Sequence, residues 1–260
     1  MKYFVFSDVH GHFSLLISKL KELGFDENNE NHMLISLGDN FDRGSENLKM
    51  YDFLKEMKEK NKIILVKGNH EDLLLKNLYR GYATDIDERN GTTKTLHEFI
   101  SRYFDEEPKT MFMYNAKEVY YKLRDEGIID FIYDMKDYYE TSNYIFTHAF
   151  IPIDQSEICY LNDWRNADSD LFYASRWING IQMSMDFNIH EPGKKIVIGH
   201  YHTSYGHVKN KYPHLVGYNT INLEFSEDAD FSIYEDDNII AIDACTNFSK
   251  QINISISPVI

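Results

Sequence analysis

The chain has 260 residues, of which 43% are hydrophobic, 15% aromatic and 27% charged. This composition is typical of a folded globular protein and excludes a disordered one, and the length suits an α/β fold, so we expect a single domain over residues 1–260. The formal charge of −15 makes most of the surface repel phosphate backbones, which excludes broad electrostatic binding of nucleic acid.

Signals for secretion or for a membrane are missing from the sequence. The apolar run at residues 3–6 is far shorter than the core of a signal peptide, and no run approaches the roughly 18–20 apolar residues of a membrane helix. The two cysteines, Cys159 and Cys245, do not suggest a disulfide framework. We therefore expect a cytoplasmic protein with no membrane partner, and the sequence leaves its oligomeric state open.

The first 70 residues alternate between the periodicities of strands and of helices. Strands are predicted from the apolar runs at residues 3–6, 33–37 and 63–66. Apolar residues at helical spacing within 13–23 and 48–57 predict the connecting helices. The third strand is apolar almost throughout, as in strands that are buried on both faces, so this part of the sheet should be parallel.

Residues 80–140 have a different character, with few apolar runs and many Tyr, Glu, Asp and Lys residues. Helical patches at 95–104 and 117–123 predict a helical insertion, whose acidic runs favour a solvated face over a binding site. The insertion could also roof the active site or contact a protein partner. Residues 205–237 should be loop-like. A second sheet is predicted from strand signals at residues 143–146, 195–198, 238–242 and 251–257.

Short polar motifs directly follow five of the predicted strands. They are Asp8-Val9-His10-Gly11, Gly38-Asp39-Asn40-Phe41-Asp42-Arg43-Gly44, Gly68-Asn69-His70-Glu71, Thr147-His148 and Gly199-His200-Tyr201-His202. Ligands of α/β sheets bind outside the carboxyl ends of the strands, where such loops converge. Asp, His and Asn suit Mn, Fe or Zn, and a shared carboxylate can hold two ions roughly 3.5–4 Å apart. The motifs therefore predict a two-metal phosphoesterase.

The motif residues divide into candidate metal ligands and candidate catalytic groups. Candidate ligands of the first metal are Asp8 and His10, with Asp39 as the bridging carboxylate. The second metal would take Asn69, His148 and His200. Because alternate residues of an extended segment share a face, His202 can reach the first metal while His200 serves the second.

Four further side chains are candidates for catalysis and phosphate binding. His70 would point toward the leaving group, and Asp42 could orient it through the other ring nitrogen. Arg43 offers a planar fork that matches phosphate oxygens. A second arginine is expected because the transferred phosphoryl carries charge on three oxygens; we favour Arg176 over Arg165, and either could instead stack on its neighbouring tryptophan.

These motifs resemble those of the calcineurin-like metallophosphoesterases, specifically the phosphoprotein phosphatase branch. The resemblance extends to His148, to Gly199-His200 and to Ile242-Asp243-Ala244, and it covers 80–140 and 205–237 least. The chain is similar to small bacterial or phage-type members, a group that includes serine/threonine phosphatases and symmetrical diadenosine tetraphosphatases. Two positions depart from the branch: His148 is followed by Ala-Phe rather than Gly or Ala-Gly, and His202 is more typical of the wider group.

The resemblance implies an α/β fold, a four-layer sandwich of two mixed β-sheets flanked by helices. It assigns Asp8 and His10 to the first metal, Asp39 to both, and Asn69, His148 and His200 to the second, with manganese or iron as the working ions. It also implies His70 as the acid, Asp42 as its partner and Arg43 on the phosphate.

The expected reaction is in-line attack of a metal-bridging hydroxide on phosphorus, without a covalent phosphoenzyme. His70 is expected to protonate the departing oxygen. A phosphoserine or phosphothreonine protein is the favoured substrate, and a dinucleoside polyphosphate of the diadenosine tetraphosphate type or another small phosphoester is the alternative. A non-catalytic metal-binding scaffold is a third hypothesis, which the complete ligand set disfavours.

Overall fold

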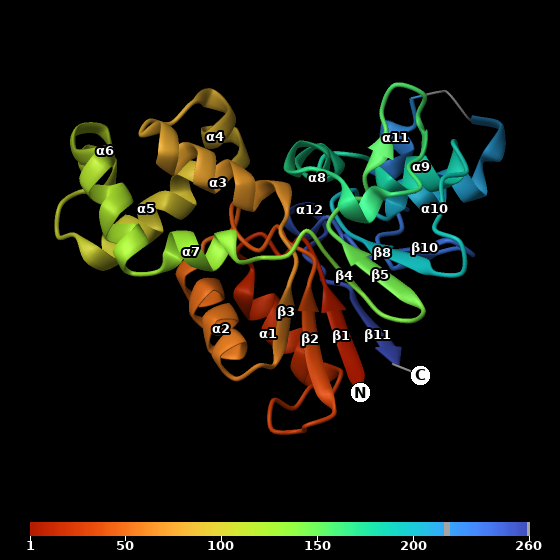
Figure 1. Ribbon diagram of the computed structural model, residues 1–260, viewed down its shortest axis with the longest axis horizontal. Coiled ribbons are helices and arrows are strands. Elements are labelled where there is room, and N and C mark those ends of the chain that lie inside the picture. Colours follow the sequence, from red (N-terminus) through yellow and green to blue (C-terminus); the bar gives the residue numbers. More distant parts are fainter. Residues whose placement is uncertain (216–218, 259–260) are drawn as a thin grey trace.

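The computed structural model describes residues 1–215 and 219–258. Two β-sheets pack against each other at the centre of the molecule, and helices cover their outer faces (Figure 1). Both sheets are mixed, so the predicted α/β fold of two mixed sheets flanked by helices is confirmed. Within the described residues, no helix combines the length and the apolar character that a membrane crossing requires.

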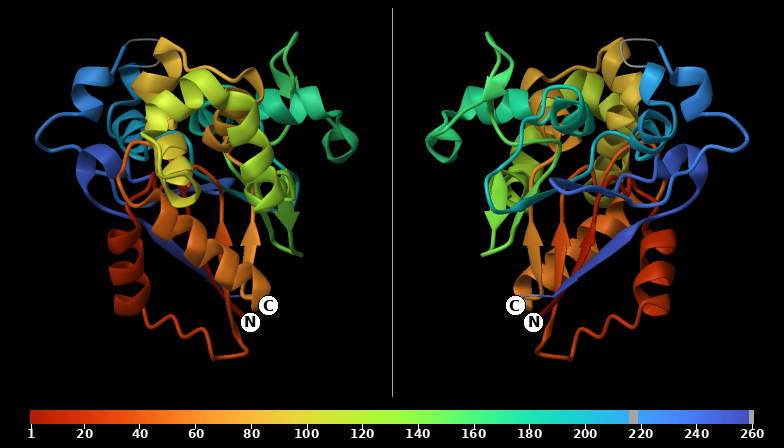
Figure 2. Two further views of the ribbon diagram at one scale, coloured as in Figure 1. Left: turned by 90° about the vertical axis from the view of Figure 1, so that its left-hand side faces the viewer. Right: turned by 90° about the vertical axis from the view of Figure 1, so that its right-hand side faces the viewer.

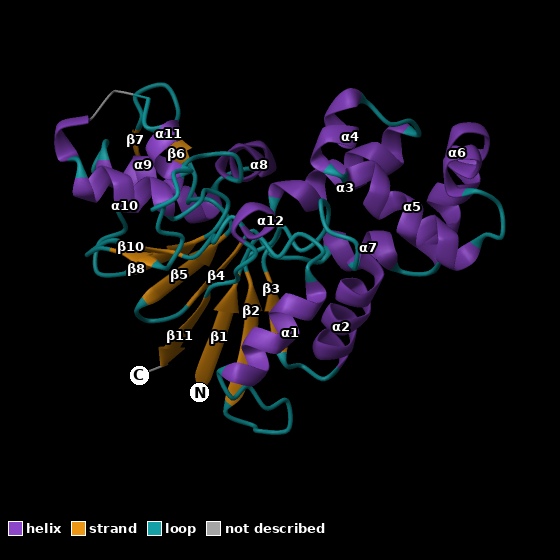
Figure 3. Ribbon diagram, turned by 180° about the vertical axis from the view of Figure 1, so that it is seen from behind, coloured by secondary structure: helices purple, strands orange, loops and turns teal. Residues whose placement is uncertain are grey.

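The first sheet contains, in spatial order, β11 (Ile254–Pro258), β1 (Lys2–Phe6), β2 (His32–Ser36) and β3 (Ile63–Leu65). The last three strands are parallel, as predicted, and α1 (Phe13–Glu22) and α2 (Asn47–Glu59) connect them. The two helices lie side by side over one face of the sheet (Figure 3). The expectation that residues 251–257 join a second sheet is wrong, because β11 pairs antiparallel with β1 and fills its free edge.

The alternation of side chains along β1 shows how the layers are held together. Phe4 and Phe6 point into the core that the helices share with the first sheet. Tyr3 and Val5 point the other way, into a second core between the sheets, where they meet Phe146 of the second sheet. A strand that is buried on both faces must be apolar at every position, which explains the continuous run at residues 3–6.

The second sheet contains β4 (Tyr138–Glu140), β5 (Tyr144–Thr147), β8 (Lys195–Ile198), β10 (Ile239–Ala241) and β9 (Tyr234–Glu235) in that order. Its outer face carries α8 (Ser169–Ser175), α9 (Gly180–Met185) and α10 (Ser204–Lys211), whose apolar side chains form a third core. The remaining short elements are β6 (Ile153–Asp154), β7 (Cys159–Tyr160), α11 (Ile221–Glu224), α12 (Thr246–Ser249) and 3-10 turns at Trp164–Asn166 and Pro213–Leu215.

The expectation that residues 205–237 form only loop is corrected by α10 and α11. Tyr205 and Val208 lie three residues apart on one face of α10 and are both buried. Two apolar side chains in a polar stretch are too few to show helical periodicity in the sequence, but they suffice to anchor a short helix on a sheet.

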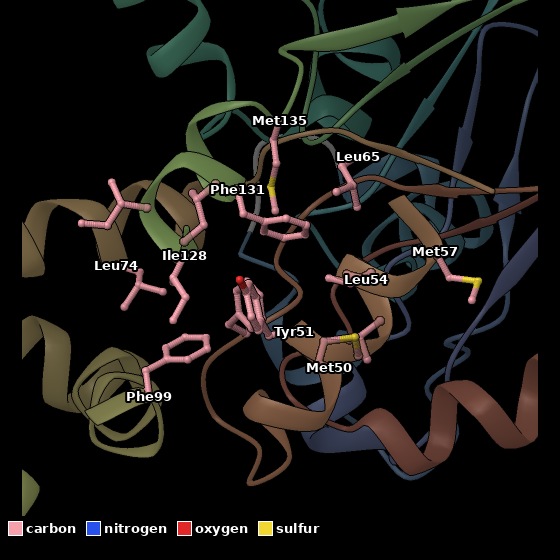
Figure 4. Packing of buried hydrophobic residues seen from close by; sticks show 14 of the residues in the cluster. Met50, Tyr51, Leu54, Met57, Leu65, Leu74, Phe99, Ile128, Phe131 and Met135 are labelled. Carbon is pink, nitrogen blue, oxygen red and sulfur yellow. The ribbon is translucent and has the colours of Figure 1, made fainter. Parts of the chain in front are cut away.

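The predicted helical insertion is present. The chain from residue 69 to residue 133 forms α3 (Asn69–Arg80), α4 (Asp85–Asn90), α5 (Thr92–Tyr103), α6 (Pro108–Asp125) and α7 (Ile128–Tyr133). Tyr51 of α2 stands between Phe99 of α5 and Phe131 of α7, with ring centroids 5.5 and 5.2 Å apart (Figure 4). The insertion therefore shares one continuous core with the first sheet.

Candidate active site

The loops after β1, β2, β3, β5 and β8 meet at one edge of the two sheets. The backbone N–H of Asp8 donates to the carbonyl of Gly38 (3.1 Å), and that of His10 donates to the carbonyl of Asp39 (3.0 Å). Across the second sheet, Gly199 donates to the carbonyl of His148 (2.6 Å). The carboxyl ends of the strands thus bring the five motif loops to one edge, as the sequence predicted.

Backbone strain is concentrated at this edge. Asp8, His10, Asp39, Asp42 and His200 all have φ between 47° and 75°, in the left-handed region that residues with a Cβ rarely adopt. Each such residue costs free energy of the order of 1–3 kcal/mol, and persists only where the surrounding structure enforces it. Strain of this kind is characteristic of binding and catalytic sites, because it aims side chains where regular secondary structure could not.

The first group of potential metal ligands surrounds His10. Its Nε2 lies 4.0 Å from Asp8 Oδ1 and 3.9 Å from Asp39 Oδ2, and all three side chains are almost fully buried. His10 Nδ1 is 3.0 Å from the carbonyl oxygen of Phe41, to which it donates. Burial lowers the pKa of His10, so the ring is neutral and its Nε2 carries a lone pair directed at the carboxylates.

The second group surrounds the amide oxygen of Asn69. Oδ1 of Asn69 lies 2.8 Å from His148 Nε2 and 3.0 Å from His200 Nδ1, and His148 Nε2 is also 3.4 Å from Asp39 Oδ1. The two oxygens of Asp39 therefore face different groups. Potential ligand atoms of Asp39, His148 and His200 all lie within 4.8 Å of one another, as do those of His10, Asp39 and His70.

The geometry of the second group fits a divalent cation. His148 Nδ1 donates to the carbonyl of Leu37 (2.8 Å), and burial lowers the pKa of the ring, so Nε2 is an unprotonated acceptor. That acceptor points at the amide oxygen of Asn69, which is another acceptor, and at a carboxylate oxygen of Asp39. Lone pairs that converge in a buried space repel one another unless a cation lies between them.

Beside these groups, His70 joins a buried carboxylate to an exposed arginine. His70 Nδ1 lies 2.6 Å from Asp42 Oδ2, and its Nε2 lies 3.3 Å from Arg43 Nη2. Burial opposes protonation of His70, but the carboxylates of Asp39 and Asp42 outweigh it and raise the pKa of the ring. The pair of His70 and Asp42 can therefore hold and deliver a proton next to the cluster of ligands.

The two arginines considered as a second phosphate clamp are both engaged by carboxylates. Arg176 donates through Nε to Asp72 (2.7 Å) and through Nη1 to Asp137 (2.8 Å), so a phosphate role for its remaining nitrogen stays a prediction. Arg165 donates to Glu140 and Glu191, and its guanidinium lies 4.4 Å from the ring centroid of Trp164. Arg165 therefore stacks on its neighbouring tryptophan, which is the structural role considered as the alternative to phosphate binding.

The structure does not bring His202 into either group. Its Nδ1 lies 2.9 Å from the hydroxyl of Ser204 and its Nε2 lies 3.3 Å from Glu224 Oε2, while the ring packs edge-on against Phe225. Burial lowers the pKa of His202 to about 4. The spacing argument fails because residues 200–202 are not an extended strand: β8 ends at Ile198 and His200 has a φ of 66°.

Several supporting residues carried no assigned role in the sequence. Glu71 is fully buried and accepts hydrogen bonds from the backbone N–H groups of Gly68, Asp39 and Asn40 at 2.8–2.9 Å. Ser7 donates to Asp8 Oδ2, which also accepts from the backbone N–H of His200 (2.8 Å). Glu71 stands in a quoted motif and could have been noticed, whereas Ser7, a lone serine just after β1, offers no comparable signal.

A family model described as calcineurin-like phosphoesterase matches residues 1–234. The chain belongs to this family. Serine/threonine-protein phosphatase 2 of Salmonella typhimurium is 42% identical over 71 residues, or 27% of this chain and 30% of that protein. Serine/threonine-protein phosphatase 1 of the same organism is 38% identical over 71 residues, with the same coverage. The matched segment thus spans under a third of these relatives.

One solved structure, described as a candidate diadenosine tetraphosphatase, aligns with a TM-score of 0.54 at 12% identity and covers 99% of this chain and 89% of that chain. At 12% identity this similarity is evidence for a shared fold alone. The shared fold covers nearly all of this chain.

Proposed function

We propose that this protein is a two-metal phosphoester hydrolase whose preferred substrates are serine/threonine phosphoproteins. The observation that carries the proposal is the position of Asp39. Its two carboxylate oxygens face two separate sets of nitrogen and oxygen ligands, and the pair of His70 and Asp42 lies beside them. A carboxylate that can be shared by two ions, with a proton donor at its side, suits metal-assisted phosphoryl hydrolysis.

The residues that would hold the two ions follow from the ligand groups. Asp8, His10 and Asp39 would hold the first, and Asp39, Asn69, His148 and His200 the second. Manganese or iron suits this mixture of oxygen and imidazole ligands, and zinc is the alternative. When bound, two divalent ions supply water of lowered pKa and neutralise charge on the phosphoryl oxygens.

The chain's own side chains provide substrate binding and proton transfer. Arg43 is exposed and its Nη2 lies 3.3 Å from His70 Nε2, so its planar fork would bind phosphoryl oxygens beside the proton donor. His70 would deliver a proton from Nε2 to the departing oxygen, while its Nδ1 stays hydrogen-bonded to Asp42. Asp42 is fully buried, so its charge is felt strongly by the imidazolium that it orients.

The substrate is inferred from the relatives and from one exposed side chain. The local likeness to two bacterial serine/threonine-protein phosphatases favours a phosphoprotein. Trp177 favours the second candidate, a dinucleoside tetraphosphate, because it is 41% exposed beside His200, with ring centroids 6.4 Å apart, and could stack on a nucleobase. A cytoplasmic location stays a prediction; Cys159 and Cys245 are both free, which is compatible with a reducing compartment.

Two substrates assayed side by side test the proposal. Phosphate release from a phosphothreonine peptide and cleavage of diadenosine tetraphosphate are each measured with manganese and with a chelator, using Asp39→Asn as the inactive control. Metal-dependent activity on the peptide alone would support the phosphoprotein phosphatase, and activity on the dinucleotide alone would replace it with the nucleotide hydrolase. Activity on neither, in protein that carries two metals, would contradict both and favour the scaffold.

A further inference from the structure

The carboxylate of Asp42 is held by two residues of the helical insertion. Thr92 Oγ1 donates to Oδ2 of Asp42 (2.7 Å), the oxygen that also faces His70 Nδ1, and Thr95 Oγ1 donates to Oδ1 (2.6 Å). All four side chains are buried. Two of the three side-chain donors to this carboxylate therefore come from the first turn of α5, and not from the motif loops.

The start of α5 is built to approach the loop at residues 42–43. Thr92 and Thr95 are three residues apart, so they lie on the same face of the helix. Gly91, which precedes them, has a φ of 87°, and a Cβ built there would lie only 3.0 Å from the Cα of Arg43. Thr95 Oγ1 also accepts from the backbone N–H of Asp42 (3.0 Å), which fixes the main chain of the loop as well as its carboxylate.

Further along the same face of α5, Glu98 also contacts the segment that follows Asp42. Glu98 accepts from the backbone N–H (2.9 Å) and the side-chain amide (2.8 Å) of Asn47, whose own Oδ1 accepts from the N–H of Asp42 (2.9 Å). Farther down the helix, Arg102 forms two hydrogen bonds of 2.6 Å with Asp52 of α2. A stripe of polar side chains on α5 thus locks the insertion onto the segment that carries Asp42.

We propose that Thr92 and Thr95 are positioning residues for His70. The inference rests on the proposed function, in which His70 protonates the departing oxygen. A carboxylate with one partner can rotate about its Cβ–Cγ bond, whereas two hydroxyl donors on different oxygens hold it in one orientation. Held in this way, Asp42 keeps the proton of His70 on Nδ1 and the ring aimed at the substrate.

The choice of leaving group separates this role from a merely structural one. Protonation by His70 matters for a strongly basic leaving group, such as the alkoxide of phosphothreonine, and matters little for a weakly basic one, such as p-nitrophenolate. Loss of orientation should therefore lower kcat on the peptide selectively. Damage to folding or to metal binding would lower both activities together.

The experiment compares Thr92→Val and Thr95→Val, which remove a hydroxyl with little change of shape. For each variant we expect kcat on a phosphothreonine peptide to fall about tenfold, with KM unchanged, and kcat on p-nitrophenyl phosphate to change less than about threefold. Thr95→Ser should retain activity because it keeps the hydroxyl. Thr93→Val is the matched control, since Thr93 is buried in the same turn and its hydroxyl has no hydrogen-bond partner among the described residues.

A second background and a second measurement keep the test decisive. In a His70→Asn protein, Thr95→Val should cause no further loss on the peptide, because the two changes remove the same function. The His70 Nδ1 proton, followed by NMR in the wild-type protein, should be protected from solvent exchange and lose protection in Thr92→Val and Thr95→Val but not in Thr93→Val. Equal losses on both substrates, an additive double variant or unchanged proton protection would each overturn the inference.

Failure of the proposed function looks different. A wild-type protein that hydrolyses neither substrate, or a His70→Asn variant with full activity on the peptide, would remove the acid role of His70. The exchange measurement would still report whether the threonines hold Asp42 against the imidazole.

Discussion

Glu71 accepts a hydrogen bond of 2.9 Å from the backbone N–H of Asp39, and through its other oxygen one of 2.9 Å from the N–H of Asn40. Glu71 belongs to the third motif loop and Asp39 to the second, so one buried carboxylate ties two strand ends together. The left-handed φ of 52° at Asp39 is held in place by this contact. Glu71 thus holds the backbone of Asp39, the proposed bridging ligand, in place.

Glu71→Gln should destabilise the protein by about 3 kcal/mol, because its amide NH₂ would face buried backbone donors that now bond a charged oxygen. Urea unfolding would measure this loss, with Glu22→Gln as the control, since the Glu22 side chain is 62% exposed and pairs with Lys19 at the surface. Looser positioning of Asp39 should also weaken manganese binding roughly 10- to 100-fold. Unchanged stability would show that these contacts are dispensable.

Removing the metals should lower the thermal stability of the protein. The lone pairs of Asn69, His148 and Asp39 face one another in a buried space, and a bound cation relieves their repulsion and favours the folded state. A chelator should therefore lower Tm by about 5–10 °C, and added manganese should restore it.

In an Asp39→Asn variant, metal content measured by mass spectrometry should fall from two ions to fewer than one. Asp134→Asn, a change at an exposed partner of Lys58, should keep both.

His70→Asn separates two roles that the geometry allows for this residue. If His70 acts as the acid, the variant should still bind both metals, and its kcat on a phosphothreonine peptide should fall by about 10²–10⁴-fold. As a ligand, its loss would remove one ion, because His70 Nε2 lies 3.8 Å from Asp39 Oδ2. Metal content and kcat measured on the same sample decide between the two, and we expect the first outcome.

Glu140 should make the stability of the second sheet sensitive to acid. Hydrogen bonds from Arg165, together with Lys194, lower the pKa of Glu140 to about 2 from its ordinary value of 4.5. A carboxylate whose pKa is lowered by folding stabilises the folded state above its unfolded pKa, and this stabilisation disappears as the pH falls toward the folded pKa.

Near pH 7 the free energy of unfolding should therefore be about 1–3 kcal/mol larger for the wild-type protein than for Glu140→Gln. This difference should become smaller below about pH 4.5. Urea unfolding at a series of pH values checks this. A gap that stays constant down to about pH 3 would exclude the ion pair as its source.

The sequence predicted most reliably what depends on strand ends. Asp8, Asp39 and His148 could be placed at one edge because apolar runs mark the strands, and parallel strands bring their carboxyl ends together. The orientation of each ring was beyond reach, since it depends on carbonyl groups such as those of Leu37 and Phe41 that only the folded chain supplies.

Long-range contacts account for the remaining differences. Arg176 meets Asp72 and Asp137, and Thr95 meets Asp42, across distances in sequence that local patterns do not encode. The spacing made His202 a candidate ligand, but the chain leaves the extended conformation at His200, and the His202 ring lies beside Ser204 and Glu224.

The pairing of β11 with β1 has a consequence for how the protein is made. The first and last strands of the described residues, β1 and β11, lie side by side (Figure 2), and Phe4 is opposite Ile256. On a ribosome, the first strand emerges early but must wait for almost all of the remaining chain before its neighbour on that side exists. Until β11 is made, the free edge of β1 can pair with other strands. We therefore expect newly made protein to depend on chaperones.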